Sequence, residues 1–225
     1  MIGVIIPVHN EVSVLEACLG HVLRAASDPL LGGEQVRIFV ALDACSDGSD
    51  RVAQAWGADT ATCNERNVGA ARACAADLAM REGVRWLAST DADSLVPEYW
   101  LSAQLACRAE AVCGTVRVTD WAMRSGYVRA RHDRHYQSRN GHRHVHGANL
   151  GVAAHAYRRA GGFAADSCGE DVSLVCRLQR LHACIAWVAH PCVITSARHS
   201  RRCPGGFSSH LDRLEWSTST DAASP

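Results

Sequence analysis

Two carboxylates that stand one residue apart, Asp91 and Asp93, directly follow the apolar run 86–90. Such a pair at the end of a strand can address one divalent cation, because Mg²⁺ and Mn²⁺ take hard oxygen ligands and often bind one or two carboxylates together with substrate phosphates. A cation held there would neutralise charge that builds up on a departing diphosphate. A solvated turn that caps the next helix is the alternative, and the pair alone leaves both interpretations open.

A second acidic pair, Glu170 and Asp171, stands at the start of the helical pattern 171–181. The positive end of a helix dipole favours the ionised form of a carboxylate at this place. An ionised carboxylate could take the proton from a substrate hydroxyl and so act as a general base. Simple helix capping is the alternative.

Polar residues also follow the other apolar runs of the first half of the chain. We expect them to form a nucleoside pocket, in which Asp43 accepts a hydrogen bond from a base N–H. Arg66 and Arg72 would hold a phosphate or close over the base, and Gly69 would allow a close backbone approach. Taken singly, these residues are also typical of ordinary turns and of a helix start with surface arginines. The candidates are Pro7, His9, Asn10, Glu11, Asp43, Arg66, Gly69 and Arg72.

Short apolar runs alternate with helical patterns in the first half of the chain. This rhythm predicts a mostly parallel sheet with helices on both faces. Ligands of such sheets sit beyond the carboxyl ends of the strands, which is where the polar candidates stand. The expected strands are 3–8, 36–42, 60–63 and 86–90, and the expected helices are 11–26, 52–56, 67–82 and 97–108.

The second half is less regular, and it shows neither an internal repeat nor a linker. We therefore expect one α/β domain over residues 1–210 and a frayed tail over 211–225. The segment 124–143 is basic and rich in histidine, and it predicts a helix followed by a mobile loop. The other expected strands are 112–118, 145–152 and 185–188, and the other expected helices are 153–160 and 171–181.

Composition narrows the class of protein. The 225 residues are 48% hydrophobic, which suffices for a substantial core. A formal net charge of zero removes the electrostatic case for nucleic-acid binding. No apolar run is long enough to span a membrane, and the N-terminal run has no basic leader. Eleven cysteines, an odd count without an export signal, indicate reduced thiols and a cytoplasmic location.

Seven short motifs occur in a fixed order along residues 1 to 200. The series resembles the family-two glycosyltransferases with the GT-A fold, in which a single Rossmann-like domain carries a smaller acceptor-side subregion. The resemblance implies a nucleotide-sugar-binding half at 1–110, an acceptor and catalytic half at 111–210, a hexosyltransferase activity and a bound Mg²⁺ or Mn²⁺. The motifs are P-V-H-N-E, L-D-A-C-S-D-G-S, R-N-V-G-A-A-R, T-D-A-D-S, H-G-A-N-L-G-V, A-G-G-F and G-E-D-V-S-L.

The same resemblance assigns functions to single residues. Asp43 would contact the base, Asp91 and Asp93 would bind ribose and metal, and Asp171 beside Glu170 would be the catalytic base. That mechanism is inverting, because the acceptor hydroxyl attacks the anomeric carbon in line as the nucleoside diphosphate leaves. Further residues assigned by resemblance are Ala92 at the nucleotide, His199 at the metal, and His146, Asn149 and Arg198 at the acceptor or diphosphate.

Three histidines alternate in the segment 142–146, which reads H-R-H-V-H. In an extended segment they would share one face, as a zinc site requires, although no fourth ligand stands at a matching spacing. Contact with the acceptor or the diphosphate, and a plain surface, are the alternatives left open.

The Q-x-x-R-W motif of processive polymer synthases is absent from the sequence. We therefore expect a single transfer to a hydroxyl of a small or lipid-like acceptor, with contact to a membrane surface and the oligomeric state left open. One alternative is a retaining transferase of the glucosyl- or mannosylglycerate type. A sugar nucleotidyltransferase would need a glycine-rich N-terminal loop, which is missing. A catalytically silent, nucleotide-sugar-binding regulatory protein is disfavoured by the intact Asp91, Asp93 and Asp171.

Overall fold

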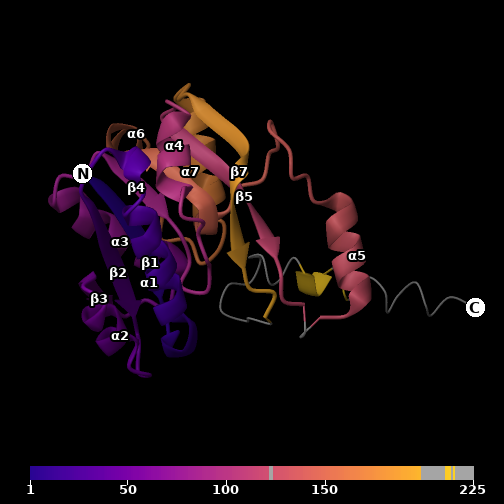
Figure 1. Ribbon diagram of the computed structural model, residues 1–225, viewed down its shortest axis with the longest axis horizontal. Coiled ribbons are helices and arrows are strands. Elements are labelled where there is room, and N and C mark those ends of the chain that lie inside the picture. The colour runs from indigo at the N-terminus through magenta and orange to yellow at the C-terminus, as the bar shows by residue number, and fades with distance from the viewer. Residues whose placement is uncertain (122–123, 199–210, 214, 216–225) are drawn as a thin grey trace, which may run out of the picture.

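Seven strands form one sheet in the order β3-β2-β1-β4-β6-β5-β7. In Figure 1, β5 and β7 lie to the right of β1, β2 and β3. The computed structural model describes residues 1–121, 124–198, 211–213 and 215. Strands β1 to β4 pair in parallel, β6 is antiparallel to both of its neighbours, and β7 is parallel to β5. The strands are β1 (Ile2–Val8), β2 (Val36–Asp43), β3 (Asp59–Cys63), β4 (Trp86–Ser89), β5 (Ala111–Val118), β6 (Leu150–Ala153) and β7 (Ile185–Thr195).

Helices connect the strands and cover both faces of the sheet. Strands β1, β2 and β3 follow one another toward one edge of the sheet, and β4 then lies on the other side of β1. Because crossovers between parallel strands are right-handed, the helix α3 before β4 lies on the face opposite α1 and α2. The helices are α1 (Val12–Ala26), α2 (Ser49–Ala55), α3 (Val68–Arg81), α4 (Trp100–Ala106), α5 (Gly126–His135), α6 (Ala154–Arg159) and α7 (Glu170–Arg180), with two 3₁₀ turns, Pro29–Leu31 and Gly147–Asn149.

Local sequence explains where several helices begin. The side chain of Asn67 accepts a hydrogen bond from the backbone N–H of Ala70 and caps α3, and Ser125 caps α5 in the same way through Val128. Strand β1 is apolar and buried along almost its whole length, as expected for a strand with helices on both sides. The predicted α/β class and mostly parallel sheet are confirmed.

Two of the predicted strands differ from the structure. The segment expected to be a strand over 145–152 instead contains the 3₁₀ turn Gly147–Asn149 and the short β6, because side chains use the backbone groups of Gly147. The strand expected at 185–188 continues to Thr195, since a register shift opposite Gly114 and Thr115 lets β7 pair with β5 beyond it.

The structure also gives information on the cysteines, on membrane-spanning helices and on the segment that was expected to be a frayed tail. Every cysteine in the described ranges is a free thiol. None of the helices in those ranges is long and apolar enough to cross a bilayer. Of the expected tail 211–225, Leu211 is fully buried and packs with Val128 and Ala197 beside α5. Residues 214 and 216–225 lie outside the described residues.

Candidate active site

A cleft of about 910 Å³ opens beyond the carboxyl ends of the parallel strands. Its centre lies at the boundary between β1 and β4, where the order of the strands reverses and α/β sheets bind their ligands. The structure brings most of the predicted site residues into this one cleft. Those that line it are Pro7, His9, Glu11, Asp43, Arg66, Arg72, Asp91, Ala92, Asp93, His146, Glu170, Asp171 and Arg198.

Asp43 organises the loop that enters α3. Its Oδ1 accepts from the backbone N–H groups of Glu65 at 2.7 Å and Arg66 at 2.9 Å, and its Oδ2 accepts from Asn67 at 2.8 Å. These bonds hold Arg66 at a positive φ of 49°, with its side chain lining the cleft. Asp43 therefore fixes the shape of the nucleotide side of the cleft, and its contact with a base stays a prediction.

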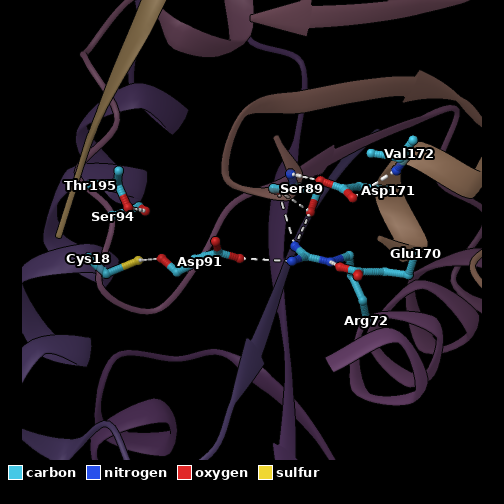
Figure 2. A network of polar contacts seen from close by, with 10 residues as sticks. Cys18, Arg72, Ser89, Asp91, Ser94, Glu170, Asp171, Val172 and Thr195 are labelled. Atoms are coloured by element: carbon cyan, nitrogen blue, oxygen red, sulfur yellow. Dashed lines mark hydrogen bonds and ion pairs between the residues drawn. The ribbon is translucent and has the colours of Figure 1, made fainter. Parts of the chain in front are cut away.

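Arg72 is buried and joins three elements of the site (Figure 2). Its Nε donates to Glu170 at 3.0 Å, its Nη2 donates to Asp91 at 2.9 Å, and its Nη1 donates to Ser89 at 2.7 Å and to the carbonyl of Gly147 at 3.1 Å. A buried guanidinium needs such partners, because an unpaired buried charge is costly. The expectation that Arg72 holds a ligand phosphate is corrected: most of its N–H groups already bind the protein.

The contacts of Gly147 explain why glycine stands there. A Cβ at this position would lie 2.5 Å from Nη2 of Arg72, so only glycine lets the guanidinium pass. Its carbonyl accepts from Arg72 and from Ser89, and its N–H donates to Oδ2 of Asp171 at 2.6 Å. One residue thus links the buried arginine to the carboxylate that the sequence predicts as a base.

Asp171 lines the cleft at the start of α7 and is held in one orientation. Its Oδ1 accepts from the N–H of Val172 at 2.7 Å, in addition to the bond from Gly147. Burial raises the pKa of Asp171 to about 6, the neighbouring Glu170 adds to the rise, and Arg72 opposes it. A carboxylate with a pKa near the working pH suits general base catalysis.

Asp91 and Asp93 occupy the turn after β4. The carbonyl of Asp91 accepts from Sγ of Cys18 at 3.3 Å, while its side chain bonds to Arg72 (Figure 2). Arg198 forms ion pairs with Glu11 and with Asp93, where 3.1 Å separates Nη2 from Oδ2. Burial raises the pKa of Asp93 to about 6, with Asp91 adding to the rise and Arg198 opposing it.

This turn fits a divalent cation that takes most of its ligands from a substrate. Among the residues that the structure describes, no three side chains of His, Cys, Asp or Glu are placed to share a metal ion. Two carboxylates suffice for Mg²⁺ or Mn²⁺, since these ions complete their shells with phosphate oxygens and water. The negative charge that raises the pKa of Asp93 favours such a cation. His199, the further predicted ligand, lies outside the described residues.

Three other predicted site residues do not line the cleft. Asn149 is buried: its Nδ2 donates to the carbonyls of Thr115 and Pro191, both at 2.8 Å, and its Oδ1 accepts from Trp100 at 2.9 Å. Asn149 therefore joins strands β5 and β7 to α4 and makes no contact on the acceptor side, which corrects the prediction.

Asn10 and Gly69 also serve the protein's own structure. The Oδ1 of Asn10 accepts from the N–H of Ser46 at 2.8 Å and so joins the turn after β1 to the loop after β2. A Cβ at Gly69 would lie 2.4 Å from the carbonyl oxygen of Ala164 and 2.5 Å from that of Asp166. The close approach that Gly69 permits is therefore that of the segment 164–166, not that of a ligand.

The alternating histidines do not converge on a common point. The rings of His142 and His144 stack at 5.5 Å, and Tyr136 stacks on His144 at 4.3 Å. Nε2 of His142 lies 3.1 Å from the carbonyl of Val188, and Nε2 of His146 lies 2.9 Å from Oη of Tyr136. The described residues contain no group of three metal-binding side chains, so the structure does not support the zinc interpretation.

Sequence reasoning missed one wall of the cleft. Helix α5 and its C-terminal residue Tyr136 contribute to it, and the helical spacing of Arg131 with His135 and of His132 with Tyr136 is the signal that could have found them. The missed residues of this wall are Arg131, His132, His135, Tyr136 and Arg213, whereas His144 belongs to the histidine segment whose contact with a ligand was left open.

Comparison with known proteins places the chain in a family. The model described as "Glycosyl transferase family 2" matches residues 3–160, which carry most of the cleft. The chain belongs to glycosyl transferase family 2. This confirms the family expected from the seven motifs. No functionally curated protein matches the sequence.

Solved structures confirm the expected GT-A fold. TarS from S. aureus in complex with UDP-GlcNAc aligns at 12% identity and a TM-score of 0.67, over 95% of this chain and 64% of TarS. The mannosyltransferase PcManGT from Pyrobaculum calidifontis, in complex with GDP-Man and Mn²⁺, aligns at 17% identity and a TM-score of 0.64, over 100% of this chain and 65% of that protein. This chain thus spans slightly less than two thirds of either relative.

Proposed function

We propose that this family 2 protein transfers a sugar from a nucleotide-diphosphate donor to a hydroxyl of an acceptor, once per encounter and with inversion. The observation that carries the proposal is the pairing of Asp91 and Glu170 with the same buried Arg72, which sets the acidic turn after β4 and the start of α7 in one cleft. The donor class is supported by the nucleotide sugars bound to TarS and to PcManGT.

On the donor side, we assign residues 1–110 to the nucleotide sugar. The nucleoside would lie among residues at the end of β1 and in the turn after it, at the end of β2, and just before α3, all of which line the cleft: Pro7, His9, Glu11, Asp43 and Arg66. Asp91 and Asp93 would hold Mg²⁺ or Mn²⁺, which when bound supplies Lewis-acid stabilisation of the leaving diphosphate. Arg198 forms ion pairs with Glu11 and Asp93 and offsets their negative charge. It would also contact the diphosphate of the donor.

On the acceptor side, we assign residues 111–210, of which 122–123 and 199–210 are outside the described ranges. Asp171 takes the proton from the acceptor hydroxyl as that oxygen attacks the anomeric carbon. The N–H groups of Gly147 and Val172 fix both carboxylate oxygens, so the base is oriented before the acceptor arrives. Such preorganisation lowers the cost of reaching the reactive geometry.

The donor assignment is tested by the melting temperature of the full chain with UDP-, GDP- and dTDP-sugars in the presence of Mn²⁺. A ligand that binds only the folded state raises the melting temperature as its concentration exceeds its dissociation constant. We expect one base to give a Mn²⁺-dependent rise. If no nucleotide sugar shifts the melting temperature, the proposed function is wrong.

The stereochemical assignment needs a product. The anomeric proton of the transferred sugar, followed by NMR from the first minutes of the reaction, reports whether the configuration is inverted or retained. Inversion is expected, since Asp171 is placed to act as a base. Retention would remove that role from Asp171 and would favour a transferase of the retaining glucosyl- or mannosylglycerate type.

A further inference from the structure

Acidic and basic side chains enter the cleft from different parts of the fold. In the part of the chain that the structure describes, the lining carboxylates come from the end of β2, from the turns after β1 and β4 and from the start of α7. We call these residues the acidic floor, and they are Glu11, Asp43, Asp91, Asp93, Glu170 and Asp171. The opposite lining comes from α5, the segment 144–146 and residue 213; we call it the basic wall, and it comprises Arg131, His132, His135, His144, His146 and Arg213.

The two surfaces differ in the side chains that they present to the cleft. On the floor side, Arg72 and Arg198 each pair with two carboxylates, and Arg66 also lines the cleft. Between α5 and residue 148, none of the described residues that line the cleft is acidic. This part of the lining therefore presents basic and neutral side chains to the cleft, a composition that favours an anion over a cation.

Contacts within the protein hold the basic wall in place. Tyr136 stacks between His132, at 4.9 Å, and His144, at 4.3 Å, and its hydroxyl also accepts from the N–H of Val116 at 2.9 Å. These contacts tie the end of α5 to β5 and to the histidine segment. Arg131 and His135 stand one helical turn apart on α5, so they share a face and reach the same region of the cleft.

The C-terminal part of the wall is tied to α5 as well. The guanidinium of Arg124 pairs with Asp212, and Leu211 packs against Val128 of α5. These contacts place Arg213 in the lining of the cleft beside the helix.

The basic wall lies next to Asp171, the proposed general base. His146 bonds to Tyr136 on one side and is followed in the chain by Gly147, whose N–H donates to Asp171. An acceptor whose hydroxyl reaches Asp171 therefore lies against the wall with its remaining atoms. The donor diphosphate, in contrast, belongs to the turn of Asp91 and Asp93 on the floor.

We propose that the acceptor carries an anionic group, a phosphate ester or a carboxylate, which Arg131 and His135 of the basic wall bind while the acceptor hydroxyl faces Asp171. The proposal rests on the proposed function and adds the chemical class of the acceptor. Arginine is suited to this task because its planar guanidinium donates two parallel hydrogen bonds to a phosphate or a carboxylate.

The first experiment measures binding. The full chain is saturated with Mg²⁺ and the nucleoside diphosphate found in the donor screen, so that the donor site is filled. Glycerol 3-phosphate, glycerate and glycerol are then titrated, and the melting temperature is recorded. We expect either or both anions to raise the melting temperature and glycerol to leave it unchanged, and the two anions separate phosphate from carboxylate recognition.

A matched pair of double variants locates the site. Arg131→Gln with His135→Gln removes the proposed contacts, and Arg129→Gln with Arg134→Gln removes charge from exposed positions of the same helix that do not line the cleft. We expect the first pair to weaken anion binding about tenfold or more, as for lost charge-assisted hydrogen bonds, and the second pair to bind as the wild type does. Nucleotide binding should be the same in all three proteins.

Two results would overturn the inference. One is an equal response to glycerol and to both anions, and the other is anion binding that the double variant at positions 131 and 135 leaves intact. If that variant instead weakens nucleotide binding, the wall holds the donor diphosphate and the inference is again wrong. The same titration without nucleotide keeps the inference testable should the donor screen fail, so the two failures are distinguishable.

Discussion

The acidic floor and the basic wall line one cleft but are built differently. On the floor, carboxylates pair with arginines, as in the group in which the buried Arg72 pairs with the buried Glu170 and with the partly buried Asp91. On the wall, Arg131 and His135 stand on a helix that is attached by stacked rings, by apolar contacts and by the ion pair of the neighbouring Arg124 with Asp212. We therefore expect the floor to contribute to stability as well as to the proposed chemistry, and we expect Arg131 and His135 on the wall to contribute mainly to recognition of the acceptor.

The strongest test of this comparison removes the base. Asp171→Asn keeps the shape of the side chain but cannot take a proton, so we expect kcat to fall roughly 10²- to 10⁴-fold, the contribution of a general base. The measurement is release of nucleoside diphosphate in the presence of acceptor. Asp50→Asn, at an exposed position of α2, is the matched control and should keep full activity. Activity of Asp171→Asn near the wild-type level would contradict the assignment.

The next test breaks the buried charge group. Arg72→Met leaves Glu170 and Asp91 without their partner, and the loss of one member of a buried ion pair costs about 3–5 kcal/mol. Urea unfolding followed by circular dichroism should show this loss in the free energy of unfolding. Arg85→Met is the control, because Arg85 forms an exposed pair with Glu34 that is worth about 0–1 kcal/mol. Equal stabilities of the two variants would show that Arg72 has no special part.

The dependence of kcat on pH tests the role of Asp171 on the floor. Because burial raises the pKa of Asp171 to about 6, the base is ionised above that pH and protonated below it. We therefore expect kcat to rise with pH through about 6 and then to level off. The profile is measured with saturating donor and cation, so that protonation of Asp93 does not contribute. A rate that stays constant down to pH 4.5 would contradict the base assignment.

The smallest expected effect concerns the wall. Arg131→Gln and His135→Gln, made singly, should change the free energy of unfolding by no more than about 0.5 kcal/mol, as is usual for substitutions away from buried networks. Urea unfolding is again the measurement. A loss as large as that of Arg72→Met would mean that the wall also carries stability, and the distinction between the two surfaces would fail.

The sequence predicted the first half of the molecule well, for physical reasons. Each strand there ends in its own polar residues, and parallel strands bring those ends together at one edge. Local patterns therefore sufficed to place Glu11, Asp43, Asp91 and Asp93 in one cleft. The start of α7 was found in the same way, from an acidic pair that follows glycine.

The predictions that failed concern residues whose hydrogen-bond partners are distant in the sequence. Arg72 meets Glu170 across 98 positions, and Asn149 meets Trp100 across 49, so local spacing cannot reveal that their polar groups are already used. The wall was missed for a related reason. Segment 124–143 was predicted to be partly helical, but the face that α5 turns to the cleft depends on its packing against Leu211 and on the stacked rings around Tyr136.

The position of β6 has a consequence for motion. This strand lies between β4 and β5, hydrogen-bonded on both sides, and it begins directly after the turn that contains Gly147. Amide hydrogens inside such a strand exchange with solvent only when much of the fold opens. We therefore expect the backbone that orients Asp171 to be anchored by a slowly exchanging strand. Opening and closing of the cleft during turnover is then expected to come from α5 and its neighbours, while the base stays in place.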